Sequence, residues 1–420
     1  MRPIIVGRML PLVPVPPRHV DQLAQPAGQE AIDRLRDAAE PLIGARVLHL
    51  NSTNFGGGVA ELLFSQVGLM NDLGLETEWR VIHGHEDFFT VTKAVHNALQ
   101  GAQIDWTPEM KEIYLRSNRE NASEWSDDYD FVIVHDPQPA AMLALLEEEG
   151  RRQGTWAWRC HIDLSNSYQP VWDYYAQWVS RYDAAVFTMK DFVRPGFDGP
   201  EVHLIPPSID PLSTKNCWIG DRTAHEVLVR YGIDARRPII TQVSRFDPWK
   251  DPLGVIDAYR IVKESVTGAQ LVMVASMAQD DPEGLHYLEL TEEHRAGDPD
   301  VFLLSNLQGV GNLEVNAIQR ESDVIVQKSL REGFGLVVAE GMWKEKPVVA
   351  GNTGGIRLQI QDGESGYLVD SVEECATRVS DLLTDPALRT AMGTAAYQRV
   401  RDAYLTPREI EDQLRMLAAL

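Results

Sequence analysis

Residues 46–72 of the chain read RVLHLNSTNFGGGVAELLFSQVGLMND, an apolar run followed by a glycine-rich turn and a second apolar segment. The run at 46–50 predicts a β-strand, and the segment from Val59 to Asp72 predicts a helix. A glycine-rich turn between a strand and a helix is typical of the first unit of a Rossmann-like sheet. Because the chain repeats this alternation, we predict an α/β protein with doubly wound parallel sheets.

The alternation occurs in two series, and 420 residues are more than one typical core accommodates. Strands of the first series are predicted at 46–50, 79–82, 131–134, 156–160 and 184–187, and those of the second at 239–243, 271–275, 301–304, 324–326 and 347–350. The dipeptide Pro206-Pro207 interrupts the pattern between the two series and predicts a linker.

These boundaries predict an extension at 1–44, Rossmann-like domains at 45–207 and 208–395, and a C-terminal helix at 396–420. We expect this helix to pack back on the N-terminal domain. We also expect the ligand to lie in a cleft between the two domains, because carboxyl ends of parallel strands and helix N-termini bind ligands.

Composition excludes several classes of protein. The net charge of -23 and pI near 4.9 argue against nucleic acid or an anionic membrane as a partner, because both need clustered cations. The three cysteines are far apart and form no Cys-x-x-Cys pair, which indicates a reducing cytoplasm rather than a disulfide or zinc framework. Prolines break the opening apolar run before it reaches signal-peptide length, and no segment approaches the ~20 apolar residues of a membrane span.

The loop REGFGLVVAE at 331–340 is the strongest indication of function. Its two carboxylates, Glu332 and Glu340, bracket a Gly-Phe-Gly turn that opens an apolar helical segment. Amides at a helix start bind phosphate, whereas carboxylates repel it. The two carboxylates are therefore predicted to hold neutral hydroxyls, such as those of a hexose and a ribose, which together with phosphate describe a sugar nucleotide.

Cations for the phosphates are predicted on the loop SRFDPWK at 244–250, which leaves the predicted strand at 239–243. Arg245 offers a planar fork for phosphate oxygens, and Lys250 a point charge. At the carboxyl end of a strand in so acidic a chain, we interpret this pair as a pyrophosphate site rather than as two surface cations.

Three other strand-end loops contain candidate residues. Asn51–Gly58 ends in Gly56, Gly57 and Gly58 but lacks dinucleotide-binding and P-loop spacing, so it is either a ligand-binding loop or a tight turn. His161 and Asp163 lie two residues apart on one side of an extended chain, as sugar ligands, as an acid–base pair or as structural residues. Asp136 follows another strand, where it either reaches the same cleft or belongs to a turn shaped by the neighbouring prolines. The acidic clusters at 127–128 and 280–283 are interpreted as solvated loops rather than metal sites.

In combination, these residues resemble the retaining glycosyltransferases of family four, which have the two-domain GT-B fold. The resemblance extends from about residue 45 to the C-terminus. The segments NST (51–53), GGGVAE (56–61), HDPQP (135–139), WRCHID (158–163) and PPSIDP (206–211) are similar to those of the trehalose glycosyltransferring synthases. Retaining trehalose phosphorylases are similar at the same places.

The resemblance implies reversible transfer of glucose from ADP-, UDP- or GDP-glucose to free glucose, which forms α,α-trehalose. A retaining trehalose phosphorylase is the first alternative. A sugar-nucleotide epimerase, which acts without an acceptor, is the second, and a non-catalytic binding protein the third. Same-face substitution is implied, in which the leaving phosphate oxygen accepts the acceptor's proton and the protein supplies positioning and charge.

The resemblance also implies residue roles. Arg245 and Lys250 would hold the diphosphate, Glu332 the donor glucose and Glu340 the ribose, with His161 near the anomeric centre. The rest of the donor site would comprise Gly333, Phe334, Gly335, Leu336 and Asn306. The acceptor and diphosphate loops would comprise Gly56, Gly57, Gly58, Asp136 and Asp163.

No tightly bound cofactor is implied, and Mg²⁺ is left open as a counterion of the donor diphosphate. The implied partners are nucleoside diphosphate glucose, glucose and trehalose, with neither nucleic acid nor membrane. A homodimer is left open.

Overall fold

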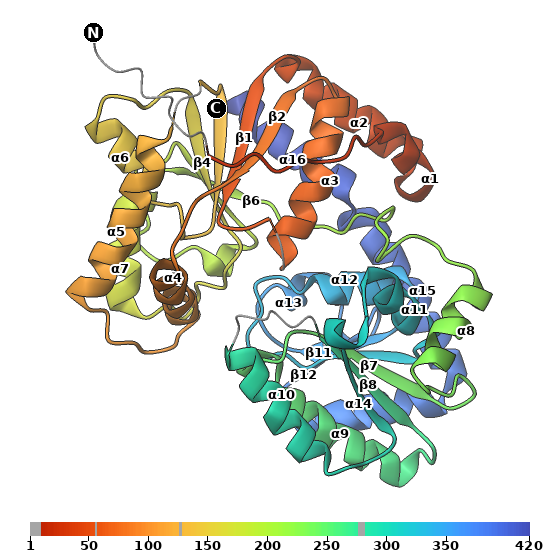
Figure 1. The fold of residues 1–420 in the computed structure, drawn as a ribbon. Helices are drawn as coiled ribbons and strands as arrows, with labels where there is room; N and C mark the ends of the chain where they lie inside the picture. Colours follow the sequence, from red (N-terminus) through yellow and green to blue (C-terminus); the bar gives the residue numbers. More distant parts are fainter. Residues whose placement is uncertain (1–9, 55–56, 126–127, 276–281) are drawn as a thin grey trace. The chain divides into compact units, whose positions relative to one another are not determined.

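The computed structural model describes residues 10–54, 57–125, 128–275 and 282–420. The chain forms two compact units (Figure 1). Unit 1 comprises Met1–Pro207 and Thr406–Leu420, and unit 2 comprises Ser208–Leu405. The division at Pro207 falls at the dipeptide that interrupts the pattern of predicted strands.

Unit 1 is built on a six-stranded parallel sheet with the strand order β2-β1-β3-β4-β5-β6. The strands are β1 (Arg46–Asn51), β2 (Glu76–Val81), β3 (Phe131–His135), β4 (Thr155–Cys160), β5 (Ala184–Phe187) and β6 (Glu201–Leu204). The helices are η1 (Val20–Leu23), α1 (Ala24–Ala27), α2 (Gln29–Ala39), η2 (Glu40–Leu42), α3 (Gly58–Asp72), α4 (Glu86–Leu99), α5 (Pro108–Ser123), α6 (Met142–Glu148), α7 (Gln169–Val179), η3 (Lys190–Phe192) and α16 (Thr406–Ala419).

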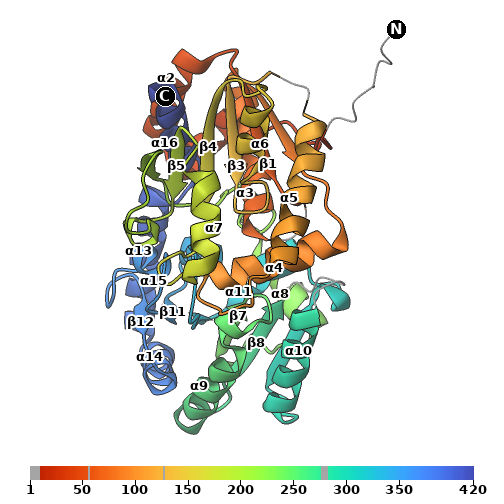
Figure 2. The same ribbon diagram turned by 90° about the vertical axis from the view of Figure 1, so that its left-hand side faces the viewer.

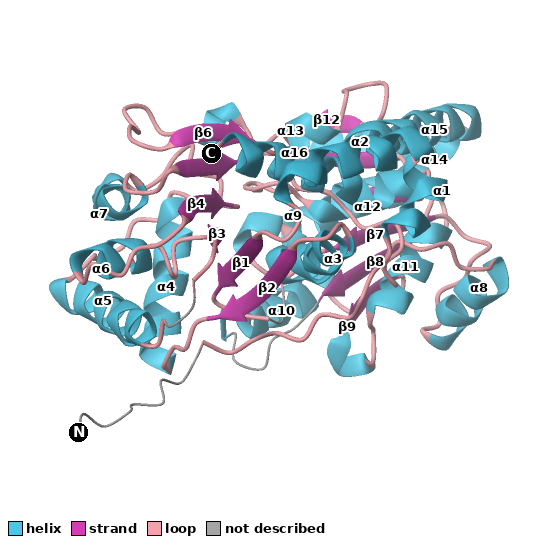
Figure 3. Cartoon of the chain, turned by 90° about the horizontal axis from the view of Figure 1, so that it is seen from above, coloured by secondary structure: helices cyan, strands magenta, loops and turns pink. Residues whose placement is uncertain are grey.

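Two helical layers cover the unit 1 sheet. Helices α5, α6 and α7 lie on one side and face the viewer in Figure 2, whereas α2, α3 and α16 lie on the other side (Figure 3). Alternate residues of each strand point to opposite faces. Leu48, Val134 and Trp158 therefore pack in the core beneath the first layer, while His49, His135 and Arg159 point to the second.

Unit 2 contains a second six-stranded parallel sheet, with the strand order β12-β11-β10-β7-β8-β9. The strands are β7 (Ile239–Val243), β8 (Gln270–Ala275), β9 (Val301–Ser305), β10 (Val324–Gln327), β11 (Val348–Gly351) and β12 (Tyr367–Val369). The helices are α8 (Asp221–Arg230), η4 (Pro248–Lys250), α9 (Pro252–Ser265), α10 (Pro282–Arg295), η5 (Asn306–Gln308), α11 (Asn312–Glu321), α12 (Leu336–Trp343), α13 (Ile356–Gln359), α14 (Val372–Thr384) and α15 (Pro386–Ala403).

The two faces of the unit 2 sheet bury separate cores. Leu271 and Met273 pack beneath α9 and α14, whereas Val272 and Val274 pack beneath α8 and α11. Successive residues of a strand are thus buried on opposite faces of the sheet. The strands therefore read as continuous apolar runs, as expected for a parallel sheet covered on both sides. Both units are therefore Rossmann-like, and the predicted α/β class is confirmed.

Two short strands were not predicted, β6 and β12. Both lie at sheet edges. The side chains of β6 are largely exposed, so its segment lacks the apolar run of a buried strand, and β12 is only three residues long. At the opposite edge, β2 begins at Glu76 rather than at the predicted Trp79. Its polar start is compatible with an edge strand that is partly exposed.

The ends of the chain differ from the predicted boundaries. Residue 396, predicted to begin the last helix, falls inside α15, and the helix break comes at Tyr404–Leu405, before Pro407. Proline in the first turn of a new helix explains this position, because it cannot continue the previous helix. Residues 10–44, predicted as an extension, belong to unit 1: Val13 donates its amide to Trp79 O at 2.8 Å, and α2 packs on α16.

Candidate functional site

The cation loop and the carboxylate loop of unit 2 follow neighbouring strands. The strand order reverses between β7 and β10, and such a switch point is where doubly wound sheets bind ligands. The amide of Leu330 donates to the carbonyl of Trp249 at 2.7 Å, which ties the two loops together. Lys250 Nζ lies 2.6 Å from Glu332 Oε2, which also accepts from Ser329 Oγ at 3.2 Å. The structure thus joins the predicted diphosphate cation to the predicted glucose ligand.

Local capping holds Lys250 in place. Asp247 Oδ1 accepts from the amides of Trp249 and Lys250 at 3.0 and 3.2 Å and so caps the short helix η4. Gln242 donates from Nε2 to the Lys250 carbonyl at 2.9 Å. Asp251 then turns the chain in the left-handed region, with φ of 48°, and caps α9 through Gly254. Its other carboxylate oxygen contacts Lys328 Nζ.

The carboxylate loop rests on a glycine pair that sequence reasoning missed. The amide of Gly355 donates to Glu332 O at 3.3 Å, and a Cβ on Gly354 would lie 1.8 Å from that oxygen. A Cβ on Gly355 would lie 2.4 Å from Gly333 O. Gln359 donates from Nε2 to Phe334 O at 2.6 Å. The GNTGG sequence at 351–355, directly after a predicted strand, was the available signal.

Replacing Gly354 with alanine is expected to displace the carboxylate loop and lower activity at least tenfold. Its φ of 46° already disfavours a side chain by about 1–2 kcal/mol, and the contact with Glu332 O adds a clash that only backbone movement relieves. Gly232→Ala is the matched control, because Gly232 has a φ of 76° and a Cβ added there would meet no atom within 4 Å. Equal activity and melting temperature in the two variants would contradict the prediction.

Glu340 lies on the buried side of α12 and is fully enclosed. Its Oε1 lies 3.2 Å from Lys215 Nζ, and its Oε2 accepts from Gln319 Nε2 at 3.4 Å. The assignment of Glu340 to a ribose stays a prediction. Lys215 was not identified from the sequence, since a single lysine after the linker carries no pattern.

The remaining predicted donor residues are spread along unit 2. Arg245 is half exposed, with Nη2 3.2 Å from Asp247 Oδ2. Gly335 adopts a φ of 83° and precedes Leu336, the first residue of α12, so the Gly-Phe-Gly turn does open a helix. Asn306 is exposed after β9, two strands from β7, or roughly 10 Å at ordinary strand spacing. The assignment of Asn306 to the donor site stays a prediction.

In unit 1, candidate residues gather at the carboxyl ends of β3 and β4. Asp136 follows β3 with a positive φ of 62°, and its Oδ1 accepts from the amide of His161 at 2.9 Å. Burial raises the pKa of Asp136 to about 7, although this amide and the Arg159 charge act in the opposite direction. Asp136 and His161, which were predicted as separate candidates, are thus linked by a hydrogen bond.

The other unit 1 predictions have different surroundings. Asp163 is buried, and its Oδ1 accepts from the amide and hydroxyl of Ser165, so it shapes the turn after β4. Gly57 precedes α3 with a φ of 87°, and both Gly57 and Gly58 are exposed. Gly56 lies outside the described residues.

His161 ends a chain of three histidines that was not predicted. His161 Nε2 lies 3.0 Å from His135 Nδ1, and His135 Nε2 lies 3.0 Å from His49 Nδ1. Burial lowers the pKa of His49 to about 3, with a smaller contribution from the Arg159 charge. Burial likewise lowers the pKa values of His135 and His161 well below the ordinary range. All three imidazoles are therefore neutral at physiological pH.

Acidification from pH 7 to 5 is expected to lower the melting temperature. Below pH ~6.5 the three histidines bind protons in the unfolded chain but not in the folded one, so folding loses stability. Asp136 opposes this: its raised pKa favours folding at low pH and loses that contribution as pH rises from ~4 to about 7. Because three groups outweigh one, thermal unfolding followed by circular dichroism should shift downward. A flat or rising profile would contradict the lowered pKa values.

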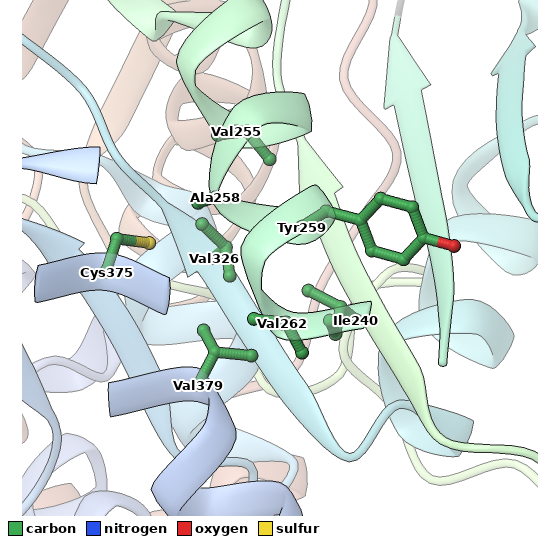
Figure 4. Close-up of a pocket in the computed structure, with 8 residues that line it drawn as sticks. All are labelled: Ile240, Val255, Ala258, Tyr259, Val262, Val326, Cys375 and Val379. Atoms are coloured by element: carbon green, nitrogen blue, oxygen red, sulfur yellow. The ribbon is translucent and has the colours of Figure 1, made fainter. Parts of the chain in front are cut away.

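A small apolar pocket in unit 2 lies apart from these loops (Figure 4). It is lined by Ile240, Val255, Ala258, Tyr259, Val262, Val326, Cys375 and Val379. The Tyr259 hydroxyl already donates to Ala269 O at 3.0 Å. With this lining the pocket offers no set of polar groups for a sugar or a phosphate, so we interpret it as a packing defect of the core.

The described part of the chain contains no group of three or more His, Cys, Asp or Glu side chains arranged to hold a metal ion. Among the described residues, no helix has the length and apolar character needed to cross a membrane.

Comparison with known proteins identifies the family. The family model "Trehalose synthase, N-terminal domain" matches residues 49–194, and "Glycosyl transferases group 1" matches residues 226–399. A trehalose synthase of Rubrobacter xylanophilus is 50% identical over 396 residues, which cover 93% of this chain and 94% of that protein. The chain belongs to the trehalose synthase family. It is therefore a trehalose-related glycosyltransferase.

More distant similarities agree with this family. A trehalose phosphorylase of Pleurotus pulmonarius is 27% identical over 402 residues, which cover 84% of this chain but 54% of that protein. An E. coli trehalose-6-phosphate structure bound with UDP-2-fluoro glucose superposes with a TM-score of 0.73 at 16% identity, covering 90% of this chain and 99% of that one. This last similarity confirms the predicted GT-B fold.

Proposed function

We propose that this member of the trehalose synthase family transfers glucose from a nucleoside diphosphate glucose to free glucose, forming α,α-trehalose reversibly and with retention. The observation that carries the proposal is the contact between Lys250 and Glu332 at the switch point of unit 2. A cation and a carboxylate at one point match a donor whose diphosphate is anionic and whose sugar is neutral.

The pair of Lys250 and Glu332 suits this donor both before and after the donor binds. Both side chains are largely buried, with 14% and 13% of their surfaces exposed, so each charge is compensated by the other before the donor binds. A bound diphosphate would attract Lys250, and the glucose hydroxyls would donate to the carboxylate of Glu332. As the sugar–phosphate bond breaks, negative charge grows on the diphosphate, and a fixed cation stabilises that charge.

The acceptor is assigned to the carboxyl edge of unit 1. There the imidazole of His161 and the carboxyl of Asp136 offer polar groups to sugar hydroxyls. No residue is required to form a covalent intermediate, because the departing phosphate oxygen accepts the acceptor's proton. Mg²⁺ remains a proposed counterion of the donor diphosphate.

One assay tests the reaction. The enzyme is incubated with trehalose and, separately, ADP, UDP, GDP or inorganic phosphate, and the products are followed by anion-exchange chromatography. We expect a nucleoside diphosphate glucose and free glucose, with an α-configured donor observed by proton NMR. Formation of glucose 1-phosphate from phosphate would instead establish a phosphorylase. In a separate incubation with a sugar nucleotide and no acceptor, its conversion to another sugar nucleotide would establish an epimerase.

Replacing Glu332 with glutamine is expected to reduce turnover more than tenfold while the fold persists. The amide keeps the shape of the side chain, but it removes the negative charge that we assign to the donor sugar. Thermal unfolding and steady-state kinetics with varied donor separate the two effects. A variant that loses its fold together with its activity would make Glu332 a structural residue.

A further inference from the structure

The three histidines form a diagonal across neighbouring strands of unit 1. His49 of β1 is level with Ile133 of β3, and His135 is level with Arg159 of β4. His135 therefore lies two residues beyond the partner of His49, and His161, directly after β4, lies two residues beyond the partner of His135. A step of two residues keeps the side chains on the same face of the sheet. The diagonal begins in the interior, where His49 is fully buried, and ends at the partly exposed His161.

The rings meet edge to edge. The planes of His135 and His161 are 11° apart, and those of His49 and His135 are 27° apart. Their ring centres lie 5.4 and 5.3 Å apart, far more than the 3.0 Å between the facing nitrogens. Nearly coplanar rings whose nitrogens are the closest atoms have the geometry of in-plane N–H···N hydrogen bonds.

One enclosed nitrogen decides the direction of both hydrogen bonds. Nε2 of His49 is buried and has no hydrogen-bond partner among the residues that the structure describes. A buried N–H without an acceptor is costly, whereas an unpaired acceptor is tolerated more often. The proton of neutral His49 therefore belongs on Nδ1, which donates to His135 Nε2.

The same reasoning applies to the next two histidines. His135 accepts at Nε2, so its own proton is on Nδ1 and is donated to His161 Nε2. His161 then accepts at Nε2 and carries its proton on Nδ1. Nδ1 of His161 is not among the enclosed unpaired polar atoms, so it is the nitrogen left for a ligand.

We propose that His49 and His135 are positioning residues that hold His161 in the Nδ1–H tautomer, so that it donates a hydrogen bond to a hydroxyl oxygen of a bound sugar. The identity of the sugar rests on the proposed function, whereas the tautomer does not. Neutrality supports the arrangement, because a doubly protonated imidazole has two donors and would break the alternation of donor and acceptor. The enclosure of the rings and, to a smaller extent, the nearby Arg159 cation oppose such protonation by lowering the pKa values of His135 and His161.

The tautomer is measurable without substrate. The full-length protein is labelled with ¹⁵N-histidine, and long-range ¹H–¹⁵N correlation spectra are recorded at pH 7.5. The eleven histidines are assigned by single substitutions, with His161→Asn identifying the signals of interest. We expect His161 to show a protonated Nδ1 and an unprotonated Nε2. A protonated Nε2 in the wild-type protein would overturn the proposal.

Substitutions test the relay of this preference. His135→Phe removes the donor to His161, so its Nε2–H tautomer should appear, whereas His135→Asn keeps a donor and an acceptor and should retain more of the Nδ1–H form. His85→Phe is the matched control, because His85 is exposed at the start of α4 of the same unit. An unchanged His161 spectrum in a folded His135→Phe protein would overturn the positioning role. If that variant fails to fold, His49→Phe tests the same relay, and the wild-type spectrum decides the tautomer.

Kinetics then connect the tautomer to catalysis. We expect His135→Phe to lower kcat about tenfold, with His135→Asn recovering part of the loss and His85→Phe losing nothing. Equal kcat in the two His135 variants would remove the link between tautomer and turnover. Absence of trehalose chemistry in the wild-type enzyme would overturn the proposed function while the spectra still report on the histidine chain.

Discussion

Replacing Lys250 with alanine is expected to lower turnover by ~10²-fold or more, the loss typical of removing one preorganised charge-stabilising donor. The Nζ atom lies 2.6 Å from Glu332 at the switch point of the unit 2 sheet, where its charge meets the departing diphosphate in our proposal. The substitution also leaves Glu332 without this partner, so donor affinity should fall as well. Steady-state kinetics with varied donor measure both effects.

A second lysine of unit 2 provides the control. Lys263 also pairs with carboxylates, with Nζ 2.9 Å from Asp298 and 3.1 Å from Asp300, but it lies near the opposite end of α9 from the cation loop. Lys263→Ala should therefore leave turnover close to that of the wild-type enzyme. Wild-type turnover in Lys250→Ala would remove the phosphate assignment, and equal losses in both variants would point to general destabilisation.

Replacing Glu409 with alanine is expected to destabilise unit 1 by about 3–5 kcal/mol, the cost of breaking a buried ion pair. Glu409 Oε1, on α16, lies 3.2 Å from Arg159 Nη2, on β4, and the two side chains are 1% and 2% exposed. Nε and Nη1 of Arg159 have no hydrogen-bond partner among the described residues. Without Glu409 the guanidinium would keep a buried charge with its main compensation removed. Thermal unfolding should shift down by about 10 °C or more.

The same helix offers a matched comparison. Arg34 Nε pairs with Glu411 of α16 at 3.2 Å, but its side chain is 52% exposed, so Arg34→Ala should cost less than about 1 kcal/mol. The double variant Arg159→Met with Glu409→Leu should recover most of the lost stability, since apolar residues can replace a buried pair. Similar melting temperatures for Glu409→Ala and Arg34→Ala would contradict this account.

Most of the fold was predictable because its signals are local. Apolar runs such as 239–243 and 324–326 correspond to β7 and β10, and a glycine-containing loop follows β10. The short edge strands β6 and β12 were missed, because β6 is largely exposed and β12 is only three residues long. Helix α16 was predicted, but its start was misplaced because an alanine-rich segment continues through residue 396.

The candidate site was predictable in part. Lys250 and Glu332 were each identified from their loops, but their contact joins residues 82 positions apart and depends on β7 lying next to β10. Gly354, which supports the carboxylate loop, was also missed. A side chain at this position is excluded by the carbonyl oxygen of Glu332, which belongs to a different loop. His49 was missed because it lies in the middle of a predicted strand, where nothing in the sequence distinguishes it from its neighbours.

The sequence by itself determined the α/β class, the division into two Rossmann-like units, the family, and the loops that carry the candidate residues. The spacing of apolar residues and the positions of glycine and proline indicate local backbone geometry. The strands, the loops and the linker between the two units follow from that local geometry. Only the tertiary structure decided that Lys250 meets Glu332, that Arg159 depends on α16, and that His161 ends a chain of three histidines. These contacts depend on strand order and burial, which no single segment of the chain specifies.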